Sequence, residues 1–255
     1  MSKVAAKVPP EAPAQAQATK RVIFTMGGKG GVGKTGVMLA LAEWFQANQI
    51  PVTLLDLDTE NKARGSLQHY FDGDAHKVNI HTPAGLDAFI DYLADGAPIV
   101  LADMGAGSGQ VAHEWFDSMY EDVAATGVGF TAVGVVTPDP ASVESVLTWA
   151  SRLQDRVKYV IVENAISKPA HFTYWQQSEQ AKQFREVFQP AIIQAECRLA
   201  ELENAARQHG VTLGKIVGRN TDVPELLKAS LVMRAQSFRR HLFSSFDSIK
   251  ESFLP

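Results

Sequence analysis

Cysteine is almost absent from this sequence. Cys197 is the single cysteine in a chain of 255 residues. One thiol excludes a disulfide within the chain, and it excludes zinc or iron–sulfur sites that need several cysteines of the same chain. This usage is typical of proteins from a reducing compartment, so we expect a cytoplasmic protein.

Long apolar runs are also absent. The longest stretch without a charged residue lies between Asp122 and Asp139, and two kinds of turn-forming residue, Gly and Pro, interrupt it. A membrane-spanning helix needs about 20 mostly apolar residues, so this stretch is better explained as a buried strand with its flanking turns. We do not expect the membrane to be a partner.

An excess of positive charge is the third feature that the sequence lacks. It has 24 Lys and Arg against 28 Asp and Glu, which gives a net charge of −4. A chain with this balance does not attract nucleic acid over its whole surface, although a local basic patch remains compatible with it.

The chain begins with a segment of different composition from the rest. Residues 1–20 are rich in Ala, Pro, Gln and Lys and have no apolar run of the kind that a signal peptide needs. They bury too little apolar surface to offset the entropy of ordering, so we expect a disordered tail. Residues 21–255 show no internal repeat and no second change of composition. They are predicted to form one domain.

Short β-rich runs alternate with helical stretches throughout this domain. The predicted strands are Arg21–Met26, Pro51–Leu57, Pro98–Ala102, Gly129–Val136 and Val157–Val162. The predicted helices between them are Thr35–Gln49, Leu86–Ala94, Val143–Leu153 and Tyr174–Val187. The alternation predicts an α/β fold, with a mostly parallel β-sheet flanked by helices on both faces.

The longest helical pattern follows Pro224. Its apolar residues form one stripe at helical spacing, namely Leu227, Leu231, Phe238, Leu242, Phe246, Ile249 and Phe253. We expect a long amphipathic helix that packs on the domain. A helix lying on a membrane surface is the alternative, but the polar side lacks the strong cationic bias of such helices.

A glycine cluster follows the first predicted strand and precedes the first predicted helix. Residues 27–35, GGKGGVGKT, fit the phosphate-loop pattern G-x-x-x-x-G-K-[ST]. Glycines let successive backbone N–H groups point at phosphate oxygens, and the helix N-terminus favours the same anion. Lys34 is suited to the β- and γ-phosphates and Thr35 to Mg²⁺. The residues predicted to bind the nucleotide here are Gly28, Lys29, Gly30, Gly31, Val32, Gly33, Lys34, Thr35 and Gly36.

Three aspartates stand at the ends of predicted strands, where α/β sheets bind ligands. Asp56 and Asp58 end the second strand, and Asp103 ends the third. An acidic residue after an apolar strand is placed to hold magnesium directly or through water. We therefore predict a magnesium site formed by Thr35, Asp56 and Asp103.

The second lysine of the loop makes these motifs resemble those of a known group. KGGVGKT, with Lys29, is similar to the deviant Walker A motif of the ParA/MinD-type P-loop ATPases of the SIMIBI class. The resemblance implies that Lys29 reaches across a homodimer to the other subunit's nucleotide. It implies that Asp58 orients the attacking water and that Asp56 accompanies it near magnesium. Lys29, Lys34 and Asp58 are thus the expected catalytic residues.

Three further segments carry the resemblance. DMGAG, at residues 103–107, is similar to the D-x-P-x-G switch of the group, with Gly105 where proline is usual, so a looser switch is expected. Asn164 ends the strand KYVIVEN and matches an asparagine that reads the adenine edge. The segment Met233–Phe243 resembles the C-terminal helix of TraL-type ATPases of conjugal transfer.

The resemblance implies a switch that dimerises with ATP and Mg²⁺ and is reset by slow hydrolysis, stimulated by a protein partner. Plasmid or DNA segregation, conjugal transfer and cargo positioning are the roles open to it. The alternative is an ATP-dependent ligase of the same fold, of the amidoligase or dethiobiotin-synthase type. Such enzymes typically lack the early lysine, so Lys29 favours the switch.

One local basic patch is a candidate for non-specific DNA binding. It consists of Lys228, Arg234, Arg239 and Arg240, and no acidic residue lies among them in the sequence. Dimerisation would double the patch, and binding to DNA phosphates would be steeply salt-dependent. The alternative is that these side chains surround a packed helix or pair with carboxylates elsewhere.

Overall fold

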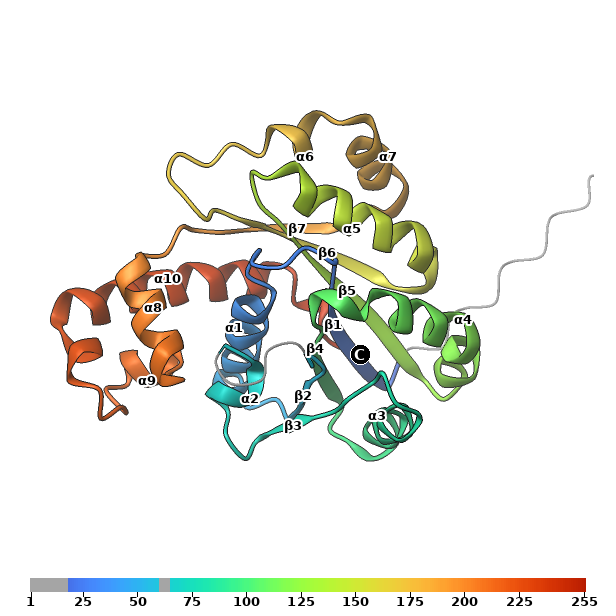
Figure 1. Ribbon diagram of the computed structural model, residues 1–255, viewed down its shortest axis with the longest axis horizontal. Helices are drawn as coiled ribbons and strands as arrows, with labels where there is room; N and C mark the ends of the chain where they lie inside the picture. Colours follow the sequence, from blue (N-terminus) through green and yellow to red (C-terminus); the bar gives the residue numbers. More distant parts are fainter. Residues whose placement is uncertain (1–17, 60–64) are drawn as a thin grey trace, which may run out of the picture.

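Parallel strands form the centre of the molecule. In this computed structural model, which describes residues 18–59 and 65–255, they make one seven-stranded sheet in the order β3-β2-β4-β1-β5-β6-β7 (Figure 1). The strands are β1 Lys20–Met26, β2 Val52–Asp56, β3 Ala75–Lys77, β4 Ile99–Asp103, β5 Val128–Val136, β6 Lys158–Asn164 and β7 Ala191–Ala195. The predicted α/β fold is confirmed.

The strands that the sequence predicts are the interior strands of the sheet, between its two edge strands. β4 is buried along its whole length, and β5 is buried except for Gly129, which explains their almost continuous apolar sequences. The two strands that were not predicted, β3 and β7, are the edge strands. They are short and carry exposed residues, so their apolar pattern is weak.

Five helices of the described chain cover one face of the sheet, and the one that follows β4 was not among the helices predicted from the sequence. They are α3 Pro83–Asp95, α4 Gly109–Ala125, α5 Pro140–Leu153, α6 Thr173–Gln177 and α7 Glu179–Phe188. Thr82 and Asp139 cap α3 and α5 by accepting hydrogen bonds from the N–H groups of Gly85 and Ala141. The predicted helix Tyr174–Val187 is divided in two, because Ser178 is extended and caps α7.

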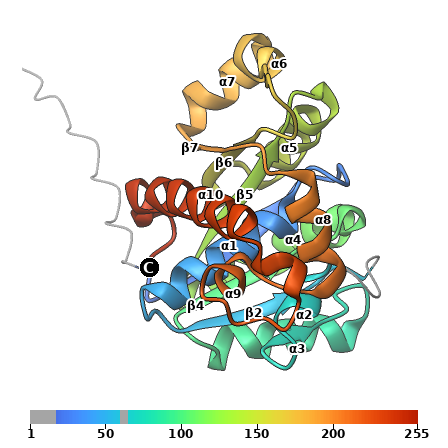
Figure 2. The same cartoon turned by 90° about the vertical axis from the view of Figure 1, so that its left-hand side faces the viewer.

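The other face is covered by α1 Lys34–Ala47, the short α2 Leu67–Tyr70 and the second half of α10 Ala229–Ser248 (Figure 2). Leu242 and Phe246 of α10 are buried against the sheet side of this layer, and the Trp44 indole N–H donates to Asp247 Oδ1 at 2.9 Å. The predicted C-terminal helix is therefore present and packed on the domain. No helix among residues 18–59 and 65–255 is long and apolar enough to cross a membrane.

A third, smaller apolar cluster lies beside α1, at one side of the molecule in Figure 1. We call it the helical cluster; it consists of α8 Ala200–His209, α9 Leu213–Val217, the 3₁₀ turn η3 Pro224–Leu227 and the first half of α10. Neither α8 nor α9 was predicted from the sequence. The remaining 3₁₀ turns are η1 Ala106–Ser108, η2 Gln154–Arg156 and η4 Lys250–Ser252.

The expected tail lies mostly outside the described residues, which begin at residue 18. Its last residue, Lys20, is the first residue of β1, and the N–H of Thr19 donates to the Gly127 carbonyl at 2.9 Å. Residues 18–20, which the sequence assigns to the tail, are therefore among the described residues, and the boundary at residue 21 stays a prediction.

Candidate functional site

The glycine cluster forms the loop between β1 and α1. Three of its glycines have positive φ, 105° at Gly27, 75° at Gly31 and 101° at Gly33, a region that side chains disfavour. At Gly33 a Cβ would also lie 2.5 Å from Asn164 Nδ2. The loop therefore needs glycine for its backbone shape and for its contact with β6. Residues 30–36, including Val32, Thr35 and Gly36, line a cavity.

The two lysines of the loop point in different directions. Lys34 is buried, lines the cavity and donates from Nζ to the Lys29 carbonyl at 3.1 Å. The Lys29 ammonium instead lies 3.3 Å from Asp139 Oδ2, at the start of α5, and its side chain is 45% exposed. Lys29 therefore belongs to the rim of the site, whereas Lys34 belongs to its interior.

Asp103 lies beneath the loop, at the end of β4. It is fully buried, and burial raises its pKa to about 7, with the carboxylates of Asp56 and Asp58 adding to the shift. The Thr35 hydroxyl and the Lys34 ammonium act in the opposite direction. One oxygen, Oδ1, accepts from Thr25 Oγ1 at 3.3 Å, while Oδ2 has no hydrogen-bond partner in the described part of the chain.

Asp56 is also fully buried, but both of its oxygens have partners. Oδ1 accepts from Lys77 Nζ at 3.0 Å and from the Asp58 N–H at 3.2 Å. Oδ2 accepts from the N–H of Gln68, which lies in α2, at 3.0 Å. Asp56 thus differs from Asp103, although the two residues are direct neighbours across β2 and β4.

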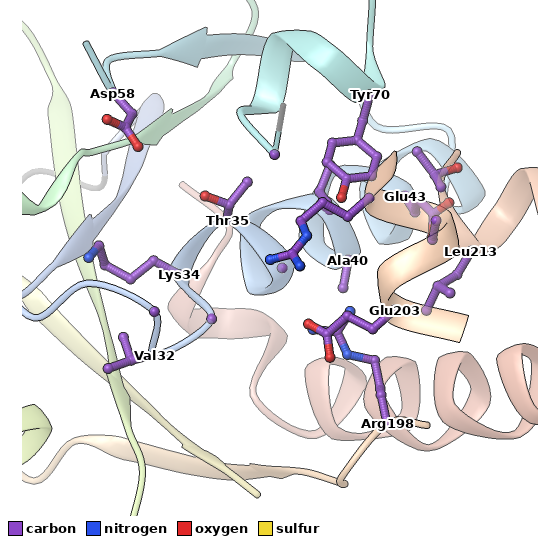
Figure 3. A pocket seen from close by; sticks show the side chains of 18 of the residues that line it. Val32, Lys34, Thr35, Ala40, Glu43, Asp58, Tyr70, Arg198, Glu203 and Leu213 are labelled. Carbon is purple, nitrogen blue, oxygen red and sulfur yellow. The ribbon is translucent and has the colours of Figure 1, made fainter. Parts of the chain in front are cut away.

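Asp58 lines the cavity at the same end as the glycine loop (Figure 3). A Cβ on Gly105 would lie 2.6 Å from Asp58 Oδ1 and 3.2 Å from Asp58 Cα, so the segment 103–107 packs closely on Asp58 and a side chain at position 105 would displace its carboxylate. The departure from proline at this position therefore has a steric reason. A looser switch stays a prediction.

The chain after this segment packs against a tryptophan. A Cβ on Gly109, the first residue of α4, would lie 3.3 Å from Trp149 Nε1, which comes from α5. The ring of His113 lies 4.9 Å from that of Trp149, centroid to centroid. The segment 103–109 thus lies between the Asp58 carboxylate and an aromatic pair.

Asn164 is close to the loop but not in the cavity lining. Its side-chain N–H₂ donates to the Val32 carbonyl at 2.8 Å. In this structure the residue holds the loop against the end of β6, and its predicted contact with adenine stays a prediction. Gly28 lies near the carbonyl of Ala106, at the outer edge of the site.

The cavity has a volume of about 440 Å³ and extends well beyond the glycine loop. Its phosphate-loop end contains Lys34, Thr35 and Asp58, and its helical end contains Tyr70, Glu203 and Leu213 (Figure 3). The sequence did not indicate the helical end. A signal was available in Arg198 and Arg207, two arginines close to an amphipathic stretch, but nothing local connects them with the loop.

Arg198 illustrates how the helical end reaches the loop. A Cβ on Gly36 would lie 2.9 Å from Nη2 of the Arg198 guanidinium. The same nitrogen lies 2.9 Å from Glu203 Oε1, with which it forms an ion pair. The ring of Phe238 from α10 lies 5.3 Å below the guanidinium. The cavity therefore joins the start of α1 to the helical cluster.

Comparison with known proteins agrees with this arrangement. The sequence profile of the CobQ/CobB/MinD/ParA nucleotide binding domain matches residues 23–231. The chain belongs to this family. No curated protein matches it individually. The matched range contains the glycine loop, all three aspartates and Asn164, so these residues lie within a nucleotide-binding domain.

Solved structures with a similar fold have low sequence identity to this chain. The MinD cell division protein of Aquifex aeolicus is 14% identical, with a TM-score of 0.48, over 92% of this chain and 98% of that one. A nucleotide-binding protein of Archaeoglobus fulgidus, solved with ADP, is 20% identical, with a TM-score of 0.46, over 76% of this chain and 88% of that one.

The site has one feature that fits a magnesium ion. Asp103 Oδ2 is a buried carboxylate oxygen without a hydrogen-bond partner in the described residues, and Thr35 and Lys34 lie close enough to shift its pKa. A phosphate-bound Mg²⁺ takes one or two protein ligands and completes its shell with phosphate and water oxygens. Thr35 and Asp103 therefore fit the ion, whereas the oxygens of Asp56 are already bonded.

The predicted basic patch is not formed as expected. Arg239 lies 3.6 Å from Glu43 Oε2 and 4.2 Å from the centroid of the Phe243 ring, and Lys228 lies 3.5 Å from Glu201 Oε1. Within the described chain Arg234 and Arg240 are exposed and have no such ion pair. Pairing with carboxylates from other helices, the alternative reading of the sequence, explains the patch better than DNA binding.

Proposed function

We propose that this protein is an ATP-dependent switch that dimerises when it binds ATP and Mg²⁺ and is reset by hydrolysis. The observation that carries the proposal is the divergence of the two lysines. Lys34 faces the cavity of its own chain, whereas the Lys29 ammonium is directed to the rim, where it is accessible to a second copy.

The phosphate-loop end supplies the groups for hydrolysis. The loop N–H groups and Lys34 hold the β- and γ-phosphates, and Asp58 orients the water from the same end of the cavity. Thr35 and Asp103 would hold a magnesium ion, which would neutralise charge that develops on the phosphates. Lys29 of the second subunit completes the site, so turnover by the monomer is slow. A protein partner that favours the dimer accelerates it.

The finer role within this proposal is DNA segregation, conjugal transfer or cargo positioning. All three use the same cycle of nucleotide-controlled association and release. The similarity of Met233–Phe243 to TraL-type ATPases supports conjugal transfer as one of these roles. An ATP-dependent ligase would instead act without a nucleotide-dependent change of oligomeric state.

The test compares Lys29→Ala with the wild type. The variant keeps MgATP affinity, because Lys34 and the loop are intact, but it loses ATP-dependent dimerisation and its hydrolysis falls about tenfold or more. Light scattering with MgATP or MgADP gives the oligomeric state, and phosphate release gives turnover. Lys250→Ala, which removes an exposed lysine of η4, is the matched control. A wild type that stays monomeric with MgATP contradicts the switch.

A second variant separates hydrolysis from dimerisation. Asp58→Ala removes the carboxylate that orients the water and leaves Lys29 and Lys34 in place, so an ATP-bound dimer accumulates. Its turnover falls about 100-fold or more, as for loss of a general base. Normal turnover in this variant would assign the water to another residue.

A further inference from the structure

Asp58 is held through its backbone N–H and carbonyl. Its N–H donates to Asp56 Oδ1 at 3.2 Å, and its carbonyl accepts from Lys77 Nζ. Lys77 and Asp56 are themselves paired, at 3.0 Å. Both backbone polar groups of Asp58 are therefore bonded to one ion pair.

This ion pair is shielded from water on one side. Asp56 has no exposed surface, and the Lys77 side chain is 31% exposed at the edge strand β3. A fully buried carboxylate needs a cation and hydrogen-bond donors, and Lys77 together with the N–H groups of Asp58 and Gln68 supplies them. The carboxylate has no oxygen left without a donor.

Asp56 and Asp103 differ in their hydrogen bonding, and the difference indicates different roles for the two aspartates. Asp103 has a buried oxygen without a partner in the described chain, as a cation ligand needs, whereas both Asp56 oxygens accept protein hydrogen bonds. Asp58 meets Gly105 on the side of its carboxylate. Asp56 and Lys77 fix the backbone of Asp58, and Gly105 limits its side chain.

We propose that Lys77 and Asp56 are a positioning pair for Asp58, and that Asp56 is not a magnesium residue. The proposal rests on the proposed function, in which Asp58 orients the attacking water. A displacement of about 1 Å in a group that aligns the attacking atom costs up to about 100-fold in rate. Loss of the pair therefore lowers kcat and leaves the phosphate contacts unchanged.

The experiment compares Lys77→Met, Asp56→Asn and the double variant with the wild type. We expect each single variant to lose about 10- to 100-fold in kcat, with nucleotide KM and the dissociation constant for MgADP within about twofold. Lys77→Arg keeps the cation and recovers part of kcat. Because the two residues act as one unit, the double variant loses no more than the worse single variant. Lys182→Met removes an ion pair of α7, with Glu179 at 2.8 Å, and is the matched control.

The magnesium dependence distinguishes this proposal from the predicted metal role of Asp56. We expect the Mg²⁺ concentration for half-maximal MgADP binding to stay unchanged in both single variants. An increase in Asp56→Asn alone makes Asp56 a metal residue and overturns the proposal, as does a Lys77→Met variant with wild-type kcat. Thermal unfolding of the nucleotide-free proteins shows that the variants are folded, and the double variant avoids an unpaired buried charge. If the wild type has no ATPase activity, the proposed function itself is wrong. If the wild type is active and the variants are unaffected, only the positioning pair is wrong.

Discussion

At the phosphate-loop end of the cavity, the functional groups come from turns that follow the adjacent strands β1, β2 and β4. At the helical end, the walls come from α8, α9 and α10, which have an apolar cluster of their own. The first end holds buried charges and backbone donors, and the second holds apolar side chains with arginines at their edge. The comparison indicates that binding of phosphate and attachment of the helical cluster are separate properties of this chain, joined through α1.

Helix α1 makes that connection through Glu43. Its side chain is buried, Oε1 accepts from the N–H of Gly214 in α9, and Oε2 lies 3.6 Å from Arg239 of α10. The same helix begins at Lys34, in the phosphate loop. Changes at either end of α1 therefore test whether the two ends are independent.

The largest effect is expected from Lys34→Ala. This variant loses the ammonium that we propose binds the β- and γ-phosphates, so its affinity for MgATP is expected to fall about 100-fold or more. Equilibrium titration with a fluorescent ATP analogue measures it. Hydrogen exchange in α8 and α9 stays at the wild-type rate, because Lys34 has no role in the helical cluster. Wild-type affinity for nucleotide would contradict the assignment of the phosphate loop.

A smaller effect, on stability, is expected from Asp103→Asn. The pKa of Asp103 is raised from 3.8 to about 7, so the folded chain keeps a proton that the unfolded chain has lost. The free energy of unfolding therefore falls as the pH rises from about 4 to about 7, and then becomes constant. Without nucleotide, the variant lacks this slope and is about 1–4 kcal/mol more stable at pH 8.

Urea unfolding at several pH values between 4 and 8 measures that difference. The same variant is expected to lose hydrolysis, because the proposed Mg²⁺ ligand is then neutral. The result would show that one residue of the phosphate-loop end both lowers the stability of the fold and is needed for hydrolysis. An Asp103→Asn variant with the wild-type pH slope would show that another group causes it.

The smallest effect is expected from two neighbouring arginines. Arg239→Ala leaves the buried Glu43 without its cation and destabilises the helical end by about 1–3 kcal/mol, measured by hydrogen exchange in α9. Arg240→Ala, one residue further along, changes stability by about 0.5 kcal/mol or less, because its side chain is exposed. MgATP affinity stays within about twofold in both. Equal effects of the two variants would contradict the pairing with Glu43.

The difference between the phosphate-loop end and the helical end of the cavity also explains which parts of the molecule could be predicted from the sequence. The glycine loop, Lys34 and the strand-end aspartates lie in short segments whose residue types state their chemistry, and the buried strands β1, β4 and β5 have strong apolar patterns. Lys77 could not be found in this way, because its three-residue strand carries little signal and its partner lies 21 residues earlier. The helical end depends on contacts such as Glu43 with Gly214, which are 171 residues apart.

Trp149 gives the protein a natural optical probe. Its indole N–H edge faces Gly109, directly after the segment that meets the Asp58 carboxylate, and the His113 imidazole lies against its ring. Tryptophan emission depends on the polarity and on the quenching groups around the indole. A displacement of residues 103–109 on nucleotide binding would therefore be visible as a change in intrinsic fluorescence, without any attached label. Trp149→Phe removes that signal and leaves Trp44, Trp115 and Trp175 as an internal reference.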